Sequence, residues 1–412
     1  METQEKIVIT GCGIVSGLGI GVQPFWEKLK AGESSIQIKD EWNTPDLDCS
    51  TPVFYSKCAD FSISEYFTDL KPPFPLRYSQ LAMMGCKLAI EDANLDLASL
   101  SPEQIGLVLD TSCSSNGAAE AFLFKLFQDG PAKVSPFIFT KTTTNCALGD
   151  VARAFTLRGP SSILLGENSV CYGYDLIKAG KADIVICGGF DEIRETAILA
   201  NQYRGYLPSV EKNGKTRTFA ESLVDEEGKV VYGEAASFVV LESESHAQKR
   251  GAKIYAQMLD YHVSGDEAYQ DFIYDRSADS LKQHLVDFSE SRQIDLEQVS
   301  LIVGASGMPW NVREYEAPVI NDLWKNSTKP FYTTVKGAVG EGFSSSPITS
   351  LITGALCLQN DTVVGSGYNP QQVGLNGAAP KLAVSYSFED DDIALVNSIH
   401  MGGNTVTVAL KK

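Results

Sequence analysis

Residues 159–189 read GPSSILLGENSVCYGYDLIKAGKADIVICGG, and this stretch decides the fold. A short apolar run over 163–165 predicts a strand, and the composition of 174–178 predicts a helix that ends near Gly180. The continuous apolar run over 182–187 is typical of a strand that is buried on both faces. The stretch therefore predicts a strand, a sharp turn, a helix and a second strand, which is an α/β arrangement.

The turn between the first strand and the helix carries Gly166, Glu167, Asn168 and Ser169. A tight turn at this place is where α/β enzymes expose a catalytic nucleophile. None of these four residues is a cysteine, so the turn has the geometry expected of a nucleophile site without a thiol.

The frame around this turn resembles the nucleophile elbow of β-ketoacyl-acyl carrier protein synthases, the condensing enzymes with the thiolase fold. The resemblance rests on Gly159-Pro160, the helix YDLIKAGKAD and the closing pair Gly188-Gly189. In that family a cysteine sits at the elbow. Counted from Gly159-Pro160, the equivalent position in this chain is Asn168.

Composition narrows the functional classes. The chain has 412 residues, 43% of them hydrophobic, and a net charge of -18 from 52 acidic and 34 basic residues. This charge argues against a nucleic-acid partner or an anionic membrane surface, and no apolar run is long enough to span a membrane. A strand begins almost at once, so we expect no signal peptide and a cytoplasmic location.

The nine cysteines form no C-x-x-C pair of the kind found in zinc sites. We expect them to be reduced and mostly buried thiols, and we expect neither a metal nor a cofactor. The glycines after the first strand, residues 6–10, also fail the dinucleotide pattern G-x-G-x-x-G, because its sixth place is Ser16.

Two histidines and a lysine serve the cysteine in the resembled family, where they polarise the malonyl group and stabilise the enolate. In this chain Ser306 stands at the first histidine position and Glu341 at the second, while Lys336 is kept. Met401, in the glycine turn HMGGN, stands where the family has a gating phenylalanine. The resemblance thus implies a pocket without its reactive groups, in which a negative Glu341 would repel a malonyl carboxylate.

Other candidate groups have weaker support. Cys113, in DTSCSSNG, resembles an active-site string but comes too early in the chain, and Cys171 lies within the predicted helix pattern. A small polar loop and a buried helical thiol are the plainer interpretations of these two residues. No motif supports the chain's four histidines, which are His246, His262, His284 and His400.

Three phenylalanines, Phe122, Phe124 and Phe127, lie in a predicted apolar helix over 118–127. One interpretation is ordinary core packing. The resemblance implies another, in which this helix lines the subunit interface, and the three phenylalanines are then candidates for setting the depth of an acyl tunnel.

The order of elements predicts two similar halves, with residues 1–250 as the N-terminal and residues 251–412 as the C-terminal ketosynthase-like half. The second half restarts with a strand over 253–259, a helix over 278–288 and a strand over 301–304. Its last pair of strands is predicted over 381–388 and 405–410. The fold class is therefore α/β, with a thiolase-like five-layer αβαβα architecture.

A retained scaffold with lost catalytic positions resembles the chain-length factor, the inactive subunit that pairs with an active ketosynthase in type II polyketide biosynthesis. This resemblance implies a heterodimer, with the acyl carrier protein bound mainly through the ketosynthase. Two alternatives stay open. One is an active condensing or decarboxylating enzyme that uses Cys113 or Cys171 with Glu341, and the other is a free-standing acyl-binding scaffold.

Overall fold

Two groups of five strands with the same strand order form the centre of the molecule. The computed structural model describes residues 5–42, 51–113, 115–223, 228–325, 327, 329–368, 370–375 and 379–412. The first group contains, in spatial order, β6 (Ser161–Leu164), β5 (Ile105–Asp110), β7 (Ile184–Asp191), β11 (Ala235–Ser243) and β1 (Ile7–Ser16). The second contains β14 (Phe331–Thr333), β13 (Val299–Val303), β17 (Ile393–Ile399), β18 (Asn404–Lys411) and β12 (Ala256–Gly265).

The two groups also share their strand directions. The three outer strands of each group are parallel, and the two inner strands are antiparallel. Antiparallel pairing of β1 with β12, with Ile7 opposite Met258 and Ile9 opposite Ala256, joins them into one 11-stranded sheet that also includes β2 (Gly19–Ile20). Because equivalent strands pair antiparallel, the halves are related by an approximate twofold axis at this seam.

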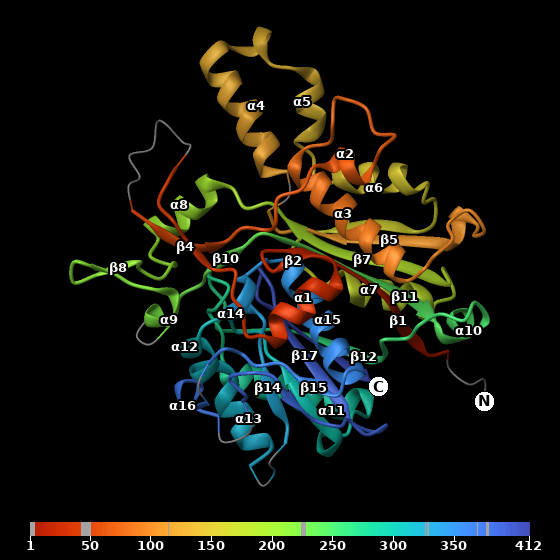
Figure 1. The fold of residues 1–412 in the computed structure, drawn as a ribbon, viewed down its shortest axis with the longest axis vertical. Coiled ribbons are helices and arrows are strands. Elements are labelled where there is room, and N and C mark those ends of the chain that lie inside the picture. Colours follow the sequence, from red (N-terminus) through yellow and green to blue (C-terminus); the bar gives the residue numbers. More distant parts are fainter. Residues whose placement is uncertain are drawn as a thin grey trace.

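Helices complete a five-layer arrangement (Figure 1). On one outer side α3 (Arg77–Asp92) and α6 (Cys146–Phe155) pack on the first strand group, and on the other side α11 (Ala278–Arg292) packs on the second, with α13 (Ala317–Leu323) against it. Between the groups lie α7 (Ser169–Lys178) and α15 (Ser345–Gln359). The predicted thiolase-like αβαβα fold with two similar halves is confirmed.

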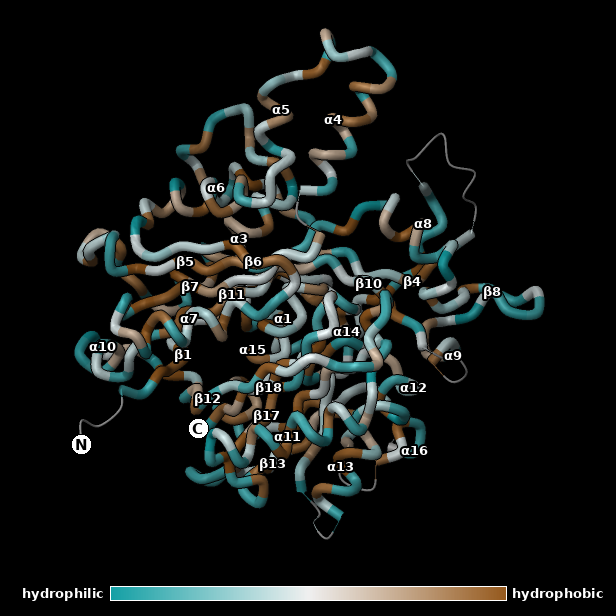
Figure 2. Tube along the Cα trace, turned by 180° about the vertical axis from the view of Figure 1, so that it is seen from behind, coloured by the Kyte–Doolittle hydropathy of each residue, from teal (hydrophilic) through white to brown (hydrophobic). Residues whose placement is uncertain are grey.

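The middle layer contains one helix, α15, whose residues are apolar or small on every face. Every residue of α15 from Ser345 to Leu358 is buried, and α15 contacts strands of both groups. A helix without a polar face is stable only when it is enclosed on all sides. The apolar strands beside it are visible as brown tube in the centre of Figure 2.

The glycine-rich stretch after residue 10 is not the loop that the sequence indicated, because β1 continues through it to Ser16. Gly11 and Gly13 face α3, and a Cβ atom at Gly13 would lie 2.2 Å from the carbonyl oxygen of Gly85. These glycines therefore allow a helix to approach the strand closely, and they do not mark a turn.

Two further sequence expectations were wrong. The predicted strand over 381–388 is reduced to β16 (Val384–Ser385), which pairs with β15 (Thr362–Val363) outside the central sheet. Its place beside β18 is taken by β17, which was not predicted. The helix after the elbow is also longer than predicted, because α7 begins at Ser169.

A pair of helices, α4 (Asn116–Asp129) and α5 (Pro136–Lys141), projects from the layered body at the top of Figure 1. We call residues 116–141 the arm. The remaining elements are α1 (Val22–Lys30), β3 (Gln37–Lys39), β4 (Val53–Ser56), α2 (Ile63–Tyr66), η1 (Pro102–Gln104), η2 (Pro131–Lys133), α8 (Glu195–Tyr203), β8 (Glu211–Lys212), β9 (Lys215–Thr216), α9 (Phe219–Ser222), β10 (Tyr232–Gly233), α10 (Glu244–Lys249), η3 (Leu296–Gln298), α12 (Pro309–Asn311), η4 (Val312–Glu316), α14 (Lys336–Val339) and α16 (Pro370–Val373).

The segment between α10 and β12 connects the two strand groups. The domain boundary at residue 250 stays a prediction. None of the described helices has both the length and the apolar character needed to cross a membrane.

Candidate functional site

The site lies where the parallel strands of both halves end. In an α/β sheet, ligands bind beyond the carboxyl ends of parallel strands. The ends of β5, β6 and β7 from the first half meet the loops that follow β13, β14 and β17 from the second. This meeting is direct, because the Ser112 hydroxyl lies 2.8 Å from the Ser344 hydroxyl and the Ser344 amide donates to Asp191 at 3.0 Å.

The elbow turn is present, and Asn168 caps the helix that follows it. The Asn168 side-chain oxygen accepts a hydrogen bond from the Val170 amide at 3.1 Å, which satisfies one of the free amides at the start of α7. Gly166 adopts a φ of 70°, and the amides of Gly166 and Glu167 donate to Asp110 at 2.9 and 3.2 Å. The Asp110 carboxylate thus holds the turn in place. The turn carries a side-chain amide, that of Asn168, where a nucleophile is expected.

A second buried carboxylate, Asp191, ties the two halves together. Its oxygens accept from the amides of Ser112, Cys113 and Ser344 and from the Thr111 hydroxyl. Burial raises the pKa of Asp191 to about 6, although these donors act in the opposite direction. Burial and the charge of Asp191 also raise the pKa of Asp110.

Lys336 and Glu341 form an ion pair inside the protein. The Lys336 Nζ atom lies 2.6 Å from Glu341 Oε2, and the two side chains are 3% and 1% exposed. The Tyr274 hydroxyl donates to the same oxygen at 3.1 Å, and the Phe343 amide donates to Oε1 at 3.0 Å. Lys336 therefore lies against the carboxylate of Glu341, and the repulsion of a malonyl carboxylate by Glu341 stays a prediction.

Ser306 follows β13 and has no exposed surface. No described residue forms a hydrogen bond with its hydroxyl. Its amide and that of Ala305 donate to the two oxygens of Glu316 at 3.0 and 2.9 Å, and the Tyr332 hydroxyl donates to Glu316 at 2.8 Å. A serine hydroxyl here offers neither the reach nor the basicity of an imidazole.

The glycine turn after β17 covers the elbow. A Cβ atom at Gly166 would lie 3.5 Å from the Met401 carbonyl oxygen and 3.6 Å from the Met401 Cβ, so Met401 lies next to the elbow turn. His400 is buried, and its Nε2 lies 3.0 Å from the Ser398 hydroxyl. Burial, followed by the nearby positive charges of Lys336 and Arg276, lowers the pKa of His400 to about 3, so its ring is neutral at physiological pH.

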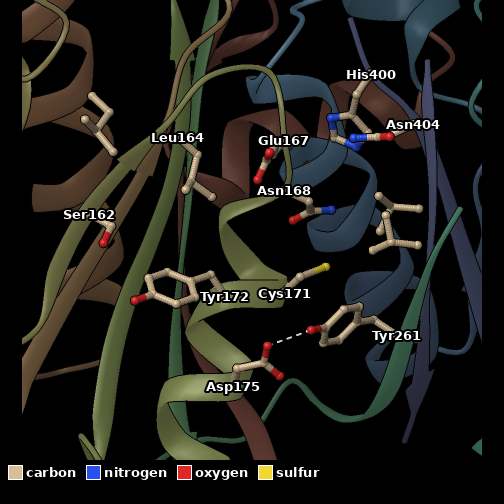
Figure 3. Close-up of a pocket in the computed structure, with 13 residues that line it drawn as sticks. Ser162, Leu164, Glu167, Asn168, Cys171, Tyr172, Asp175, Tyr261, His400 and Asn404 are labelled. Carbon is tan, nitrogen blue, oxygen red and sulfur yellow. Dashed lines mark hydrogen bonds between the residues drawn. The ribbon is translucent and has the colours of Figure 1, made fainter. Parts of the chain in front are cut away.

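A cavity of about 480 Å³ opens beside the elbow. Figure 3 shows Asn168, Cys171 and Asp175 along one face of α7, with His400 and Asn404 across the cavity from them. The Tyr261 hydroxyl donates to Asp175 at 2.7 Å. The remaining wall comes from β6, β12 and β18, so the cavity lies at the edge of the first strand group.

Neither candidate thiol has the surroundings of a nucleophile. Burial, followed by the negative charges of Asp191 and Glu192, raises the pKa of Cys113. Burial also raises the pKa of Cys171, with Asp175 as the next cause. Reactive cysteines lie near positive charge, so both residues are expected to remain protonated thiols.

The structure brings some of the predicted site residues together and leaves others apart. Lys336 contacts Glu341, and Asn168 and His400 line one cavity. Phe122, Phe124 and Phe127 lie on the arm. The role assigned to each of these residues from the sequence stays a prediction.

Sequence reasoning missed the buried acids Asp110, Asp191 and Glu316, as well as Tyr274. Asp110 and Asp191 each end a buried strand, and a carboxylate at that place is a signal that could have been used. Glu316 and Tyr274 follow no such pattern. Within the described part of the chain, no cluster of three or more histidine, cysteine or acidic side chains could hold a metal ion. The described cysteines are all free thiols.

Comparison with known proteins agrees with this geometry. Residues 4–247 match the family described as "Beta-ketoacyl synthase, N-terminal domain", and the chain belongs to this family. A 3-oxoacyl-[acyl-carrier-protein] synthase 2 from Synechocystis is 24% identical over 424 residues, which cover 99% of this chain and 98% of that protein. The synthase of the same name from Staphylococcus aureus strain COL is 27% identical over 65% of this chain and 64% of that protein.

Solved structures share the fold at lower identity. "The ishigamide ketosynthase/chain length factor" superposes with a TM-score of 0.84 at 21% identity, covering 100% of both chains. A ketosynthase from a complex with its type II PKS acyl-carrier protein gives 0.81 at 19% identity, covering 99% of this chain and 100% of that chain. These likenesses establish the fold.

Proposed function

We propose that this chain is a chain-length factor, a ketosynthase-like subunit that performs no condensation itself and forms a heterodimer with an active ketosynthase of a type II polyketide system. The observation that carries the proposal is the substitution of all three reactive positions, Asn168, Ser306 and Glu341, within a retained site frame. Losing one member of a catalytic set lowers the rate by roughly 10⁴–10⁶-fold, and here three are replaced.

The substituted groups are also built into the structure. Asn168 caps α7, Glu341 is paired with Lys336, and the only imidazole on the elbow cavity, among the described lining residues, is the neutral His400. Asn168 and Glu341 thus each form contacts within the protein that stabilise the site. This arrangement supports the proposal that the site is retained for its shape.

The surface supports a partner subunit. The arm exposes Leu123, Phe124, Phe127, Phe137 and Phe139, and Phe127 is 81% exposed. Burying a large apolar side chain stabilises a complex by roughly 1.5–3 kcal/mol, so this surface favours association. The strand β6 ends the first strand group, and its outer edge is unpaired in the described chain, which leaves a further edge open beside the arm.

The partner that we propose is a ketosynthase with the same fold, and one structural relative is itself titled a ketosynthase/chain length factor. In this heterodimer Phe124 and Phe127 reach the partner's acyl tunnel and limit its depth. Phe122 packs on Phe139 with ring centroids 5.5 Å apart and stabilises the arm. Met401 remains the equivalent of the gating residue. The acidic chain leaves the docking of an acidic acyl carrier protein mainly to the partner.

The two alternatives have less support. An active enzyme using Cys113 or Cys171 requires a thiolate, and both thiols have raised pKa values. A free-standing acyl-binding scaffold would hold its ligand without a partner subunit, whereas the exposed aromatic side chains of the arm favour association with a partner. A second cavity, of about 390 Å³ beyond the end of β7, has a charged lining that does not suit an acyl chain and includes Lys39, Lys57, Glu120, Arg194, Glu195 and Glu234.

The decisive experiment is co-expression of the chain with an intact ketosynthase of a type II polyketide system from the same genome. We expect a one-to-one complex that makes product, and no product from the chain alone. Intact mass spectrometry after incubation with acyl carrier protein loaded with an acyl group should show no acyl adduct on this chain. An adduct on Cys113 or Cys171, or product formed by the chain alone, would refute the proposal.

A further inference from the structure

The arm touches the body only at its two ends. Ala118 is the only buried residue of α4, and no residue from 121 to 140 is buried. Figures 1 and 2 show the arm clear of the layered body from both sides. The direction in which the arm points is therefore determined by the contacts at its two attachment points.

The first attachment point is Glu120, in the second turn of α4. The Arg194 Nε atom donates to Glu120 Oε2 at 3.0 Å, and the Thr196 hydroxyl donates to the other oxygen. Arg194 is fixed in turn by Glu192, at 3.2 Å. A Cβ atom at Gly117 would lie 3.3 Å from Arg194 Cδ, so glycine allows the arginine to lie against the first turn of the helix.

The second attachment point is Lys141, the last residue of α5. Its Nζ atom lies 3.4 Å from both oxygens of the buried Asp150 and 3.1 Å from the Cys146 sulfur, both in α6. The Tyr78 hydroxyl donates to the Lys141 carbonyl at 3.0 Å. Because α6 packs on β5 and β6, this attachment connects the arm to the open edge of the sheet.

The two attachment points also constrain each other. The Ser115 hydroxyl, just before α4, donates to the carbonyl of Thr142, just after α5, at 2.6 Å. The arm is therefore a closed helical hairpin whose ends are joined and which is anchored by one ion pair on each side. One pair is formed by Arg194, directly before α8, and the other by Asp150 of α6.

Geometry makes these anchors important for binding. At 1.5 Å per residue, the 14 residues of α4 span about 21 Å, so a tilt of about ten degrees moves the tip by about 4 Å. Such a shift would misplace the exposed phenylalanines against any rigid partner. Arg194 is 41% exposed, and a partly exposed pair adds little to overall stability. The ion pair between Arg194 and Glu120 should therefore affect the position of the arm.

We propose that Arg194 and Lys141 are positioning residues that hold the arm at the angle at which it docks on the partner ketosynthase. This inference rests on the proposed heterodimer. An arm held in its docking orientation loses less conformational freedom when the complex forms, which strengthens binding without adding a contact.

The test uses the full chain and the ketosynthase with which it forms a complex on co-expression. Arg194→Gln and Lys141→Met are each expected to raise the Kd about tenfold, and Lys141→Arg should restore affinity. Arg153→Gln is the matched control, because Arg153 also lies 3.4 Å from Asp150 but is 78% exposed and does not belong to the arm. Glu120→Gln provides a milder break of the first anchor if Arg194→Gln folds poorly.

A second measurement needs no partner. Hydrogen exchange of amides in 117–140 should become faster in Arg194→Gln and Lys141→Met, whereas amides of β5 and β7 keep their rates. Unchanged affinity and unchanged arm exchange in these variants would overturn the inference while leaving the proposed function intact. If the unaltered chain does not bind the ketosynthase, the proposed function fails, and this inference fails with it.

Discussion

At the scale of single residues, the Lys336–Glu341 pair is a buried ion pair at the centre of the candidate site. Both charges are buried and close, so each is tolerated only in the presence of the other. Glu341→Gln should therefore lower the free energy of unfolding by about 3–5 kcal/mol, because it leaves a buried ammonium without its counter-charge. Urea unfolding followed by circular dichroism measures this.

Two further variants test whether burial of the ion pair causes this loss of stability. Asp322→Asn breaks the pair with Lys282, in which both side chains are about half exposed, and should leave the free energy of unfolding nearly unchanged. Lys336→Met combined with Glu341→Gln should be less damaging than Glu341→Gln alone. Equal losses in the double and the single variant would contradict the ion-pair explanation.

A buried histidine makes a pH-dependent contribution to stability. His284 lies 2.7 Å from the Ser264 hydroxyl and 3.0 Å from the Thr407 hydroxyl, and burial lowers its pKa to about 3. The unfolded chain takes up this proton near pH 6.5 and the folded chain does not. The stabilisation is therefore complete above about pH 6.5 and is lost as the pH falls toward 3.

Replacement of His284 by glutamine should remove this pH dependence. The stability difference between the unaltered chain and His284→Gln should shrink by about 1.4 kcal/mol per pH unit between about pH 6.5 and 4.5. Asp191 has the opposite sign: its raised pKa, about 6, means that its ionisation disfavours the fold as the pH rises through that value. The stability difference between the unaltered chain and Asp191→Asn should therefore change with pH in the opposite direction to that of His284→Gln.

The chemical type of each substituted residue could be predicted from the sequence, but its partners could not. Asn168 and Glu341 were found because Gly159-Pro160 and Lys336 keep their places in the chain. The hydroxyl that contacts Glu341 belongs to Tyr274, 67 residues away, and no local pattern encodes this contact. Contacts between loops that lie so far apart in the sequence depend on the completed fold.

At the scale of elements, the contact between β1 and α3 depends on glycine. Gly13→Ala should destabilise the protein by about 1–3 kcal/mol or more, because the new methyl group would meet the backbone of α3 and not a mobile side chain. Gly149→Ala is the matched control. Nothing lies within 4 Å of its Cβ position in α6, so this change should be stabilising by about 0.5–1 kcal/mol.

The exposed face of α4 should be needed for assembly and not for folding. Phe124→Asp with Phe127→Asp should leave the unfolding free energy within about 0.5 kcal/mol, because both side chains are already exposed. The same pair should weaken binding to the ketosynthase by at least about 100-fold. Lys125→Ala, on the same helix, is the control and should bind normally. Normal binding by the double variant would contradict the role of the arm.

Elements with a strong local pattern were predicted well, and elements defined by their neighbours were not. The strand predicted over 405–410 lies within β18 (Asn404–Lys411), and the helix predicted over 278–288 begins at the first residue of α11 (Ala278–Arg292). The continuation of β1 through Gly11 and Gly13 was missed, because the requirement for small residues comes from α3 on the opposite side of the contact. The phenylalanines of α4 allowed a core interpretation because composition does not distinguish a core helix from a helix that awaits a partner.

At the scale of the whole molecule, the exposed arm and the open edge predict the behaviour of the isolated chain. We expect concentration-dependent self-association in sedimentation velocity, since these aromatic side chains are exposed and no part of the chain that the structure describes covers them. Addition of the ketosynthase should replace this with one discrete complex. A chain that stays monomeric at high concentration and ignores the ketosynthase would contradict both expectations.

The seam between β1 and β12 has a consequence for synthesis on the ribosome. Ile7, close to the start of the chain, pairs with Ser243 on one side and with Met258 on the other. The apolar residues at the N-terminal end of β1 therefore wait for β11 and β12 to be synthesised before either edge is satisfied, and contacts of such large sequence separation slow folding. Throughout that interval the nascent chain exposes an unpaired apolar segment. The yield of folded protein in a cell should therefore depend on chaperone capacity and translation speed more strongly than it does for a protein whose first strand pairs locally.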